Sequence, residues 1–289
     1  FDWLLPLCLL CLGLLVGSFL NVVIYRLPIM LQREWRNQSR ELLTAAGLEL
    51  PAPAEEAAFN LVAPRSCCPD CNTPIKAWQN IPLLSFAMLR GRCAACGKKI
   101  SWRYPIVELL TGLLSGLVAW YFGFGVQALG ALLLTWALIA LTLIDLDTQL
   151  LPDVITLPLL WLGVGFALVY PAPEGFTTLT ESVIGAIAGY LSLWSVYHLF
   201  KLMTGKEGMG YGDFKLLGAL GAWLGWKMLF PIILLSALVG AITGIGMILL
   251  RGRDRQLPIP FGPFLAAAGF IALLWGPQLV SRYLEVSGL

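Results

Sequence analysis

Aspartates stand at two places where a long apolar run of this chain meets a polar loop. The first is Asp145–Asp153, which reads Asp-Leu-Asp-Thr-Gln-Leu-Leu-Pro-Asp and follows an uncharged stretch. The second is Asp213, which ends the segment Gly-Met-Gly-Tyr-Gly-Asp. Ionisable side chains at the edge of a membrane span are costly and usually serve a function. These acids are therefore the first candidates for chemistry.

Two carboxyl groups that meet in such a place do not both ionise, because like charges repel, so the pair holds one proton and titrates as a unit. The ionised member can activate water while the protonated member donates to the carbonyl oxygen of a peptide bond. The spacing does not choose between Asp145 and Asp147 as partner of Asp213. Hydration, or a favourable place at a helix N-terminus, is the alternative reading for each acid, Asp153 included.

The glycines before Asp213 would let an extended peptide backbone approach the acid. A phosphate-binding loop is the other reading of a glycine-rich turn. The chain has no lysine-serine ending after these glycines and no dinucleotide-binding unit, so that reading is not favoured.

Two Cys-x-x-Cys pairs predict a metal site. Cys68 and Cys71 form the first pair, and Cys93 and Cys96 form the second after 21 intervening residues. Four thiolates at this spacing suit a closed, structural zinc site. Cys67 is a spare neighbour that could compete with Cys68. The alternative is a redox pair, but no thioredoxin-like pattern surrounds either motif.

Composition places these groups in a membrane protein. Hydrophobic residues make up 58% of the chain and charged residues 12%, against about a quarter charged in soluble domains. We expect an all-α polytopic membrane protein of about eight transmembrane helices, with a small zinc-stabilised cytoplasmic domain inserted after the first helix. The expected spans are 3–25, two within 109–144 that separate at 122–125, 154–173, 182–200, a short one at 214–226, 228–250 and 256–281.

The positive-inside rule orients these spans. If residues 26–103 lie on the first side, that side holds seventeen lysines and arginines and the other side holds only Lys227 and Arg282. The 26–103 loop, the 201–215 loop and the 251–258 loop are therefore expected in the cytoplasm. Asp145 and Asp213 then lie at the cytoplasmic ends of their helices.

Five motifs in order resemble the bacterial type IV prepilin peptidases, also called prepilin leader peptidase/N-methyltransferases. The motifs are the segment from Gly17 to Pro28, the paired Cys-x-x-Cys, Arg103-Tyr104-Pro105 with Glu108, the Asp145–Asp153 run, and Gly210-Tyr211-Gly212-Asp213-Phe214-Lys215. The Gly-x-Gly-Asp motif is also similar to that of the presenilin-type intramembrane aspartyl proteases.

The resemblance implies that Asp145 and Asp213 are the catalytic aspartates, since Asp147 and Asp153 match neither position. It implies that Cys68, Cys71, Cys93 and Cys96 match the tetracysteine motif of the bifunctional members. The implied domains are 1–27 as the first transmembrane helix, 28–103 as a cytoplasmic loop domain with the zinc site, and 104–289 as a transmembrane aspartyl protease core.

The implied substrates are prepilins or pseudopilins with a short basic leader before a hydrophobic helix. The implied activity is cleavage after a glycine, followed by methylation of the new N-terminal residue from S-adenosylmethionine, in the bacterial inner membrane. No residue is assigned to the methyl donor. The other function classes are a secondary transporter with intramembrane acids and a membrane thiol-redox protein that uses Cys8 and Cys11 or the loop thiols.

Several further residues have two readings. Glu108 would anchor the site or pair with Arg103. His198 would relay protons or simply pack, and Asn21 would form a hydrogen bond between helices. Five glutamates of the first loop would attract a basic leader or form a solvated face, and the solvated face is favoured; they are Glu34, Glu41, Glu49, Glu55 and Glu56.

Overall fold

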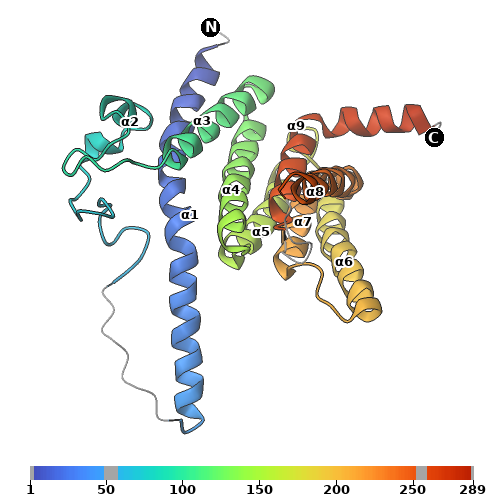
Figure 1. Ribbon diagram of the computed structural model, residues 1–289. Helices are drawn as coiled ribbons and strands as arrows, with labels where there is room; N and C mark the ends of the chain where they lie inside the picture. The colour runs from blue at the N-terminus through green and yellow to red at the C-terminus, as the bar shows by residue number, and fades with distance from the viewer. Residues whose placement is uncertain (1–2, 49–57, 252–258, 288–289) are drawn as a thin grey trace. The chain divides into compact units, whose positions relative to one another are not determined.

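The computed structural model describes residues 3–48, 58–251 and 259–287, and in this part of the chain the regular secondary structure is helical, apart from two isolated bridges within residues 67–99. This confirms the expected all-α class. The helices are α1 (Leu4–Ala45), η1 (Ala77–Asn80), α2 (Leu84–Met88), α3 (Arg103–Phe122), α4 (Val126–Thr148), α5 (Asp153–Val169), α6 (Leu179–Thr204), α7 (Tyr211–Leu224), η2 (Trp226–Met228), α8 (Leu229–Arg251) and α9 (Gly262–Ser287), as Figure 1 shows.

The chain divides into two compact units, Phe1–Leu117 and Val118–Leu289, and each is described by itself. The Cys-x-x-Cys pairs belong to the first unit and both candidate aspartates belong to the second. Some predicted features lie outside the described residues. They are Glu49, Glu55 and Glu56, Arg253 and Arg255, and the predicted start of the last span at Gln256.

The first unit is built on α1, which runs without a break through Pro28 to Ala45. The expected first span and the charged helical stretch that follows it are therefore one helix of 42 residues. α3 packs on α1 through small residues. A Cβ at Gly17 would lie 2.8 Å from the Cα of Glu108, and Gly13 meets Ser115 in the same way. Such close approach is typical of membrane helix pairs.

The loop after α1 is attached to that helix by Arg26, which is buried. The Arg26 guanidinium donates to the carbonyl oxygens of Asn60 and Pro64, at 2.8 and 2.7 Å. The Phe59 ring lies against Arg26 and Arg33, with its centroid 4.6 Å from the Arg33 guanidinium carbon. Arg26 therefore satisfies loop carbonyls that no helix or sheet would satisfy.

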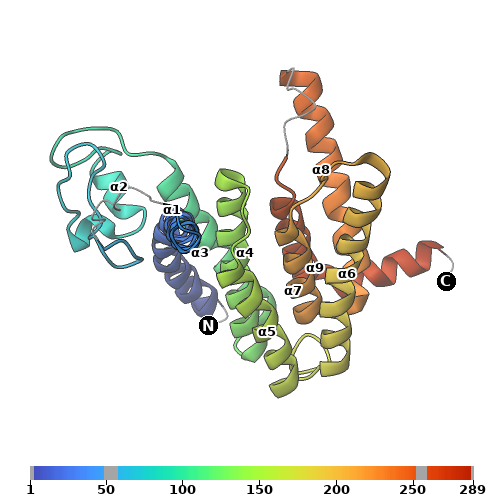
Figure 2. The ribbon, with the colours of Figure 1, turned by 90° about the horizontal axis from the view of Figure 1, so that it is seen from below.

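The second unit is organised around α7, which is buried along most of its length. It packs against α6, α5 and α9, and Figure 2 shows it beside α6 and α9. Glycines allow this packing, because the main chains of Gly185 and Gly221 touch between α6 and α7. A Cβ at Gly163 of α5 would meet the Trp223 ring at 2.7 Å. The short helix predicted at 214–226 therefore packs closely on its neighbours.

Among the residues that the structure describes, six helices are long and apolar enough to cross a membrane: α1, α3, α4, α6, α8 with the η2 turn before it, and α9. α5 has 17 residues and α7 has 14, so both fall short of the usual length. The structure therefore supports a multi-pass membrane protein but does not confirm the count of eight. The expected break near residue 123 is present, where Gly123 has a φ of +66° between α3 and α4.

Candidate functional site

The structure brings Asp145 and Asp213 together inside the second unit. Asp145 lies in the last turn of α4 and is 5% exposed, while Asp213 lies in the first turn of α7 and is 6% exposed. The two carboxyl groups are close enough for the charge of Asp145 to act on Asp213. Two buried acids from separate helices thus lie near each other, as a carboxyl pair that shares a proton would need to.

Local sequence explains how the two helix ends meet. α4 stops at Gln149, which adopts the left-handed conformation with a φ of 54°, and α5 begins after Pro152. The short turn between them carries Leu151. A Cβ at Gly212 would lie 2.6 Å from the Cβ of Leu151, and a Cβ at Gly262 would lie 3.1 Å from its Cδ1. Leu151 therefore packs between the first turns of α7 and α9, and fixes their spacing beside Asp145.

The other acids of the 145–153 run lie elsewhere. Asp147 is exposed. Asp153 is also exposed and accepts from the Lys215 ammonium through both carboxylate oxygens, at 2.6 and 2.7 Å. This ion pair joins the first turn of α5 to the first turn of α7. Burial therefore separates Asp145 from its neighbours, a distinction that spacing did not provide.

Three residues at the acidic pair were not singled out from the sequence: Leu151, Lys215 and Gly262. The main-chain N–H of Gly262, the first residue of α9, donates to Oδ2 of Asp145 at 3.1 Å. The sequence held one signal for it, the Pro260-Phe261-Gly262-Pro263 stretch, because proline is common at the first turn of a helix. That signal predicts a helix start but not what the helix start touches.

The four predicted cysteines of the first unit form a cluster. The Sγ atoms of Cys68, Cys71, Cys93 and Cys96 all lie within 4.8 Å of one another. The Cys68–Cys96 and Cys71–Cys93 sulfur distances are 3.8 and 3.9 Å. A tetrahedral zinc with Zn–S bonds of ~2.3 Å places its sulfurs ~3.8 Å apart. The residues therefore fit a closed four-thiolate zinc site, and Cys67 stands outside the cluster.

Each cysteine pair sits on the same kind of turn. In the first turn, Asn72 N–H donates to the Cys68 carbonyl and Cys68 N–H donates to the Thr73 carbonyl. In the second, Gly97 N–H donates to the Cys93 carbonyl and Cys93 N–H donates to the Lys98 carbonyl. Asn72 and Gly97 both have positive φ, at 55° and 71°, which glycine and asparagine tolerate best.

Hydrogen bonds favour the thiolate form of two of the four thiols, whereas at Cys96 a backbone hydrogen bond from Lys98 is outweighed by burial and the neighbouring thiols, which raise the pKa of that thiol to about 11. The Thr73 hydroxyl, 3.2 Å from Cys71 Sγ, lowers the pKa of that thiol to about 6. Backbone N–H groups of Cys96 and Ala95 lower the pKa of Cys93 as well. Thiolates are the form that binds a metal. Lys98 and Asp70 form an ion pair at 2.7 Å that links the two turns.

Other predicted residues have identifiable contacts. The Glu108 carboxylate is buried and accepts from the Leu83 N–H at 3.0 Å, so it anchors the loop before α2. Asn21 donates to the Tyr104 carbonyl at 3.2 Å, which is the expected bond between helices α1 and α3. The His198 ring packs on Trp194, with centroids 4.2 Å apart, in agreement with a packing role.

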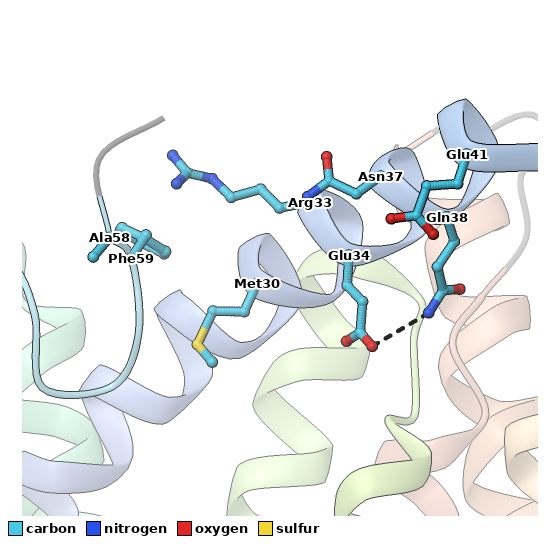
Figure 3. Close-up of a pocket in the computed structure, with 8 residues that line it drawn as sticks. All are labelled: Met30, Arg33, Glu34, Asn37, Gln38, Glu41, Ala58 and Phe59. Atoms are coloured by element: carbon cyan, nitrogen blue, oxygen red, sulfur yellow. Dashed lines mark hydrogen bonds between the residues drawn. The ribbon is translucent and has the colours of Figure 1, made fainter. Parts of the chain in front are cut away.

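A shallow groove lies beside α1 in the first unit, and Figure 3 shows it. Its lining residues are Met30, Arg33, Glu34, Asn37, Gln38, Glu41, Ala58 and Phe59. Glu34 accepts a hydrogen bond from Gln38 at 3.3 Å, and Arg33, Arg36 and Arg40 lie on the same helix. Because acids and bases alternate, this face is not an acidic surface, in agreement with a solvated helix face.

Comparisons with known proteins match the whole length of the chain. The model of the Bacterial Peptidase A24 N-terminal domain matches residues 11–122. The model of the Type IV leader peptidase family matches residues 132–245, which include both aspartates. No solved structure matches the chain significantly.

The curated relatives include three proteins named "Prepilin leader peptidase/N-methyltransferase". That of Stutzerimonas stutzeri is 58% identical over 98% of this chain and 95% of its own length. That of Pseudomonas aeruginosa is 58% identical over 98% and 94%, and that of Neisseria gonorrhoeae is 53% identical over 90% and 87%. With its acidic pair on α4 and α7 and its four-cysteine cluster, the chain belongs to the type IV leader peptidase family.

Proposed function

We propose that this protein is a membrane aspartyl peptidase that removes the short basic leader of type IV prepilins or pseudopilins and then methylates the new N-terminal residue. One observation supports the proposal: α4 and α7 each bury an aspartate, close enough for one charge to act on the other, in a chain of this family. Transport and thiol-redox functions are not favoured, because the relatives are named as peptidases.

The two aspartates divide the peptidase chemistry between them. The ionised carboxylate takes a proton from water, and the water oxygen bonds to the carbon of the scissile carbonyl. The protonated carboxyl gives its proton to the carbonyl oxygen, which yields a neutral tetrahedral diol. The carbon–nitrogen bond then breaks as the carboxyl group that took the water's proton gives it to the leaving nitrogen, while the other carboxylate takes a proton from one diol hydroxyl, whose oxygen becomes the carbonyl of the new carboxyl group. Burial excludes competing bulk water and strengthens both hydrogen bonds.

The topology suits such a substrate. A basic leader stays in the cytoplasm, where the positive-inside rule places the acidic ends of α4 and α7. The hydrophobic helix behind the leader lies among the membrane helices, so the cleaved bond falls at the membrane surface. The protein is accordingly assigned to the bacterial inner membrane, with the 26–103 loop and both aspartates facing the cytoplasm.

The first unit holds the proposed metal site. Zinc held by Cys68, Cys71, Cys93 and Cys96 supplies a structural link between the two turns, because four thiolates close its coordination shell. The proposed methyl donor is S-adenosylmethionine. The proposed domain limits are 1–27 for the first span, 28–103 for the cytoplasmic zinc domain and 104–289 for the peptidase core.

Asparagine at either aspartate tests the peptidase. Asp145→Asn and Asp213→Asn each keep the shape of the side chain but cannot hold or transfer the shared proton. We expect each to lower prepilin cleavage by roughly 10⁴-fold, as removal of an essential catalytic group does. The measurement is mass spectrometry of a purified prepilin incubated with the protein in detergent.

The matched control is Asp147→Asn, an exposed aspartate on the same helix, which should cleave at the wild-type rate. Methyl transfer to a pilin that has already lost its leader reports whether each variant is folded. Wild-type cleavage by either Asp145→Asn or Asp213→Asn would refute the proposal.

A further inference from the structure

A main-chain amide from a distant part of the chain holds one of the two acids. Gly262 N–H donates to Asp145 Oδ2 at 3.1 Å, and the bond is buried. The two residues are 117 positions apart, and Gly262 is the first residue of α9. The first amides of a helix have no partner within it. The α9 terminus therefore offers a donor that Asp145 accepts.

A side chain at residue 262 would force the side chains beside it to shift. A Cβ there would lie 2.6 Å from Asp145 Oδ2, closer than real Cβ contacts. It would lie 3.1 Å from Leu151 Cδ1, a tight contact that a flexible side chain can relieve. Gly262 does not have the positive φ that would itself demand glycine. A side chain at this position therefore collides first with the candidate catalytic carboxylate.

The bond limits how the Asp145 carboxyl group can turn. A carboxylate rotates easily about its last torsion when nothing holds it. Because Gly262 occupies Oδ2, the remaining oxygen, Oδ1, is the one available to take a proton from water. Catalytic groups need to be held closely in their reactive geometry, and an error of 1 Å can cost about 100-fold in rate.

We propose that Gly262 is a positioning residue: its amide fixes the Asp145 carboxylate so that Oδ1 meets the attacking water. This inference rests on the proposed peptidase function and adds to it a residue from α9, beyond the two helices that carry the acids.

Gly262→Ala is the test. We expect kcat for prepilin cleavage to fall about 100-fold, with KM within about twofold of wild type, because Asp145 is displaced while the rest of the site is intact. Methyl transfer to a pilin without its leader should be unchanged. The matched control is Gly165→Ala in α5, where a Cβ meets nothing within 4 Å; it should retain both activities.

A second variant separates Asp145 from Leu151. Leu151→Ala removes the contact that a Cβ at position 262 makes with Leu151, but it leaves the collision with Asp145. The double variant Gly262→Ala/Leu151→Ala should therefore stay about 100-fold below Leu151→Ala alone. Recovery to the rate of Leu151→Ala would overturn the inference, because Gly262 would then serve only to make room for Leu151.

Two further results would also overturn it. Loss of methyl transfer together with cleavage in Gly262→Ala would show that the glycine is needed for folding. Wild-type kcat in Gly262→Ala, alongside an inactive Asp145→Asn, would refute the positioning role and leave the peptidase assignment intact. Normal cleavage by Asp145→Asn would instead refute the proposed function itself.

Discussion

At the scale of single residues, the structure distinguishes two adjacent cysteines, of which only one belongs to the four-cysteine cluster. Cys67 and Cys68 are adjacent, yet only Cys68 is buried with its sulfur in the cluster. Cys67 pairs with Pro74 in an isolated bridge of extended backbone, where successive side chains point to opposite sides. The geometry therefore assigns the ligand that the spacing left undecided.

Cys68→Ser and Cys67→Ser should differ sharply. We expect Cys68→Ser to lose bound zinc and to lower the thermal stability of the first unit, because three thiolates leave the metal's shell open and metal binding contributes folding energy. Cys67→Ser should keep the metal. Elemental analysis of both purified variants measures zinc per chain. Zinc loss in Cys67→Ser, or full zinc in Cys68→Ser, would contradict the ligand assignment.

Local sequence does not distinguish Asp145 from Asp147 as the partner of Asp213. The two lie two positions apart on α4, about 200° around the helix, so they face opposite sides. The sequence predicted that one of them pairs with Asp213, and the family resemblance selected Asp145. The physical reason is that Asp145 faces Gly262, 117 residues away, and no local pattern records such a contact.

At the scale of elements, the Asp153–Lys215 pair joins the starts of α5 and α7. Both side chains are partly exposed, at 54% and 26%. Solvent weakens such a pair to about 0.2–1 kcal/mol. The ion pair therefore contributes little to stability. Its main effect is to position the start of α7, because Lys215 lies two residues after Asp213.

Charge reversal tests this link. Asp153→Lys and Lys215→Asp each place like charges together, so we expect each to reduce cleavage several-fold and to lower the unfolding free energy by about 1 kcal/mol. The double variant Asp153→Lys/Lys215→Asp restores opposite charges and should recover most of both. Thermal unfolding in detergent and the prepilin cleavage rate measure this. A double variant as poor as the worse single variant would argue against the pair.

Several elements followed directly from composition. The break between α3 and α4 at residue 123 and the short, glycine-rich α7 were both predicted, because glycine and uncharged length are visible in sequence. The continuity of α1 through Pro28 was not predicted. Proline usually marks a helix boundary, and Pro28 is instead buried inside a continuous helix, which the sequence around it does not indicate.

At the scale of the whole molecule, charge placement predicts the orientation. Seventeen lysines and arginines fall on one side of the expected membrane and two on the other. This alternation requires α5 and α7 to cross the membrane as well, and both are shorter than the six helices that are long enough to do so. The orientation therefore stays a prediction from charge, whereas the contacts between distant segments come from the structure.

Reporter fusions measure that orientation. Alkaline phosphatase needs disulfides and is active only outside the cytoplasm. Fused after Phe124, which is 95% exposed between α3 and α4, it should be active. Fused after Thr204, at the end of α6, it should be inactive, and a green fluorescent protein there should fluoresce. The reverse pattern would mean that both aspartates lie on the outer side.

The length of α1 has a mechanical consequence. Its 42 residues measure ~63 Å, while the hydrocarbon layer needs only about 30 Å. About half of the helix therefore extends past the bilayer, and its far end is displaced whenever the helix tilts. A change in tilt of about 10° moves a point ~27 Å beyond the bilayer by about 5 Å. Arg26, which binds the next loop, lies near the point where the helix leaves the bilayer, so the same tilt would move that loop much less than the far end of α1.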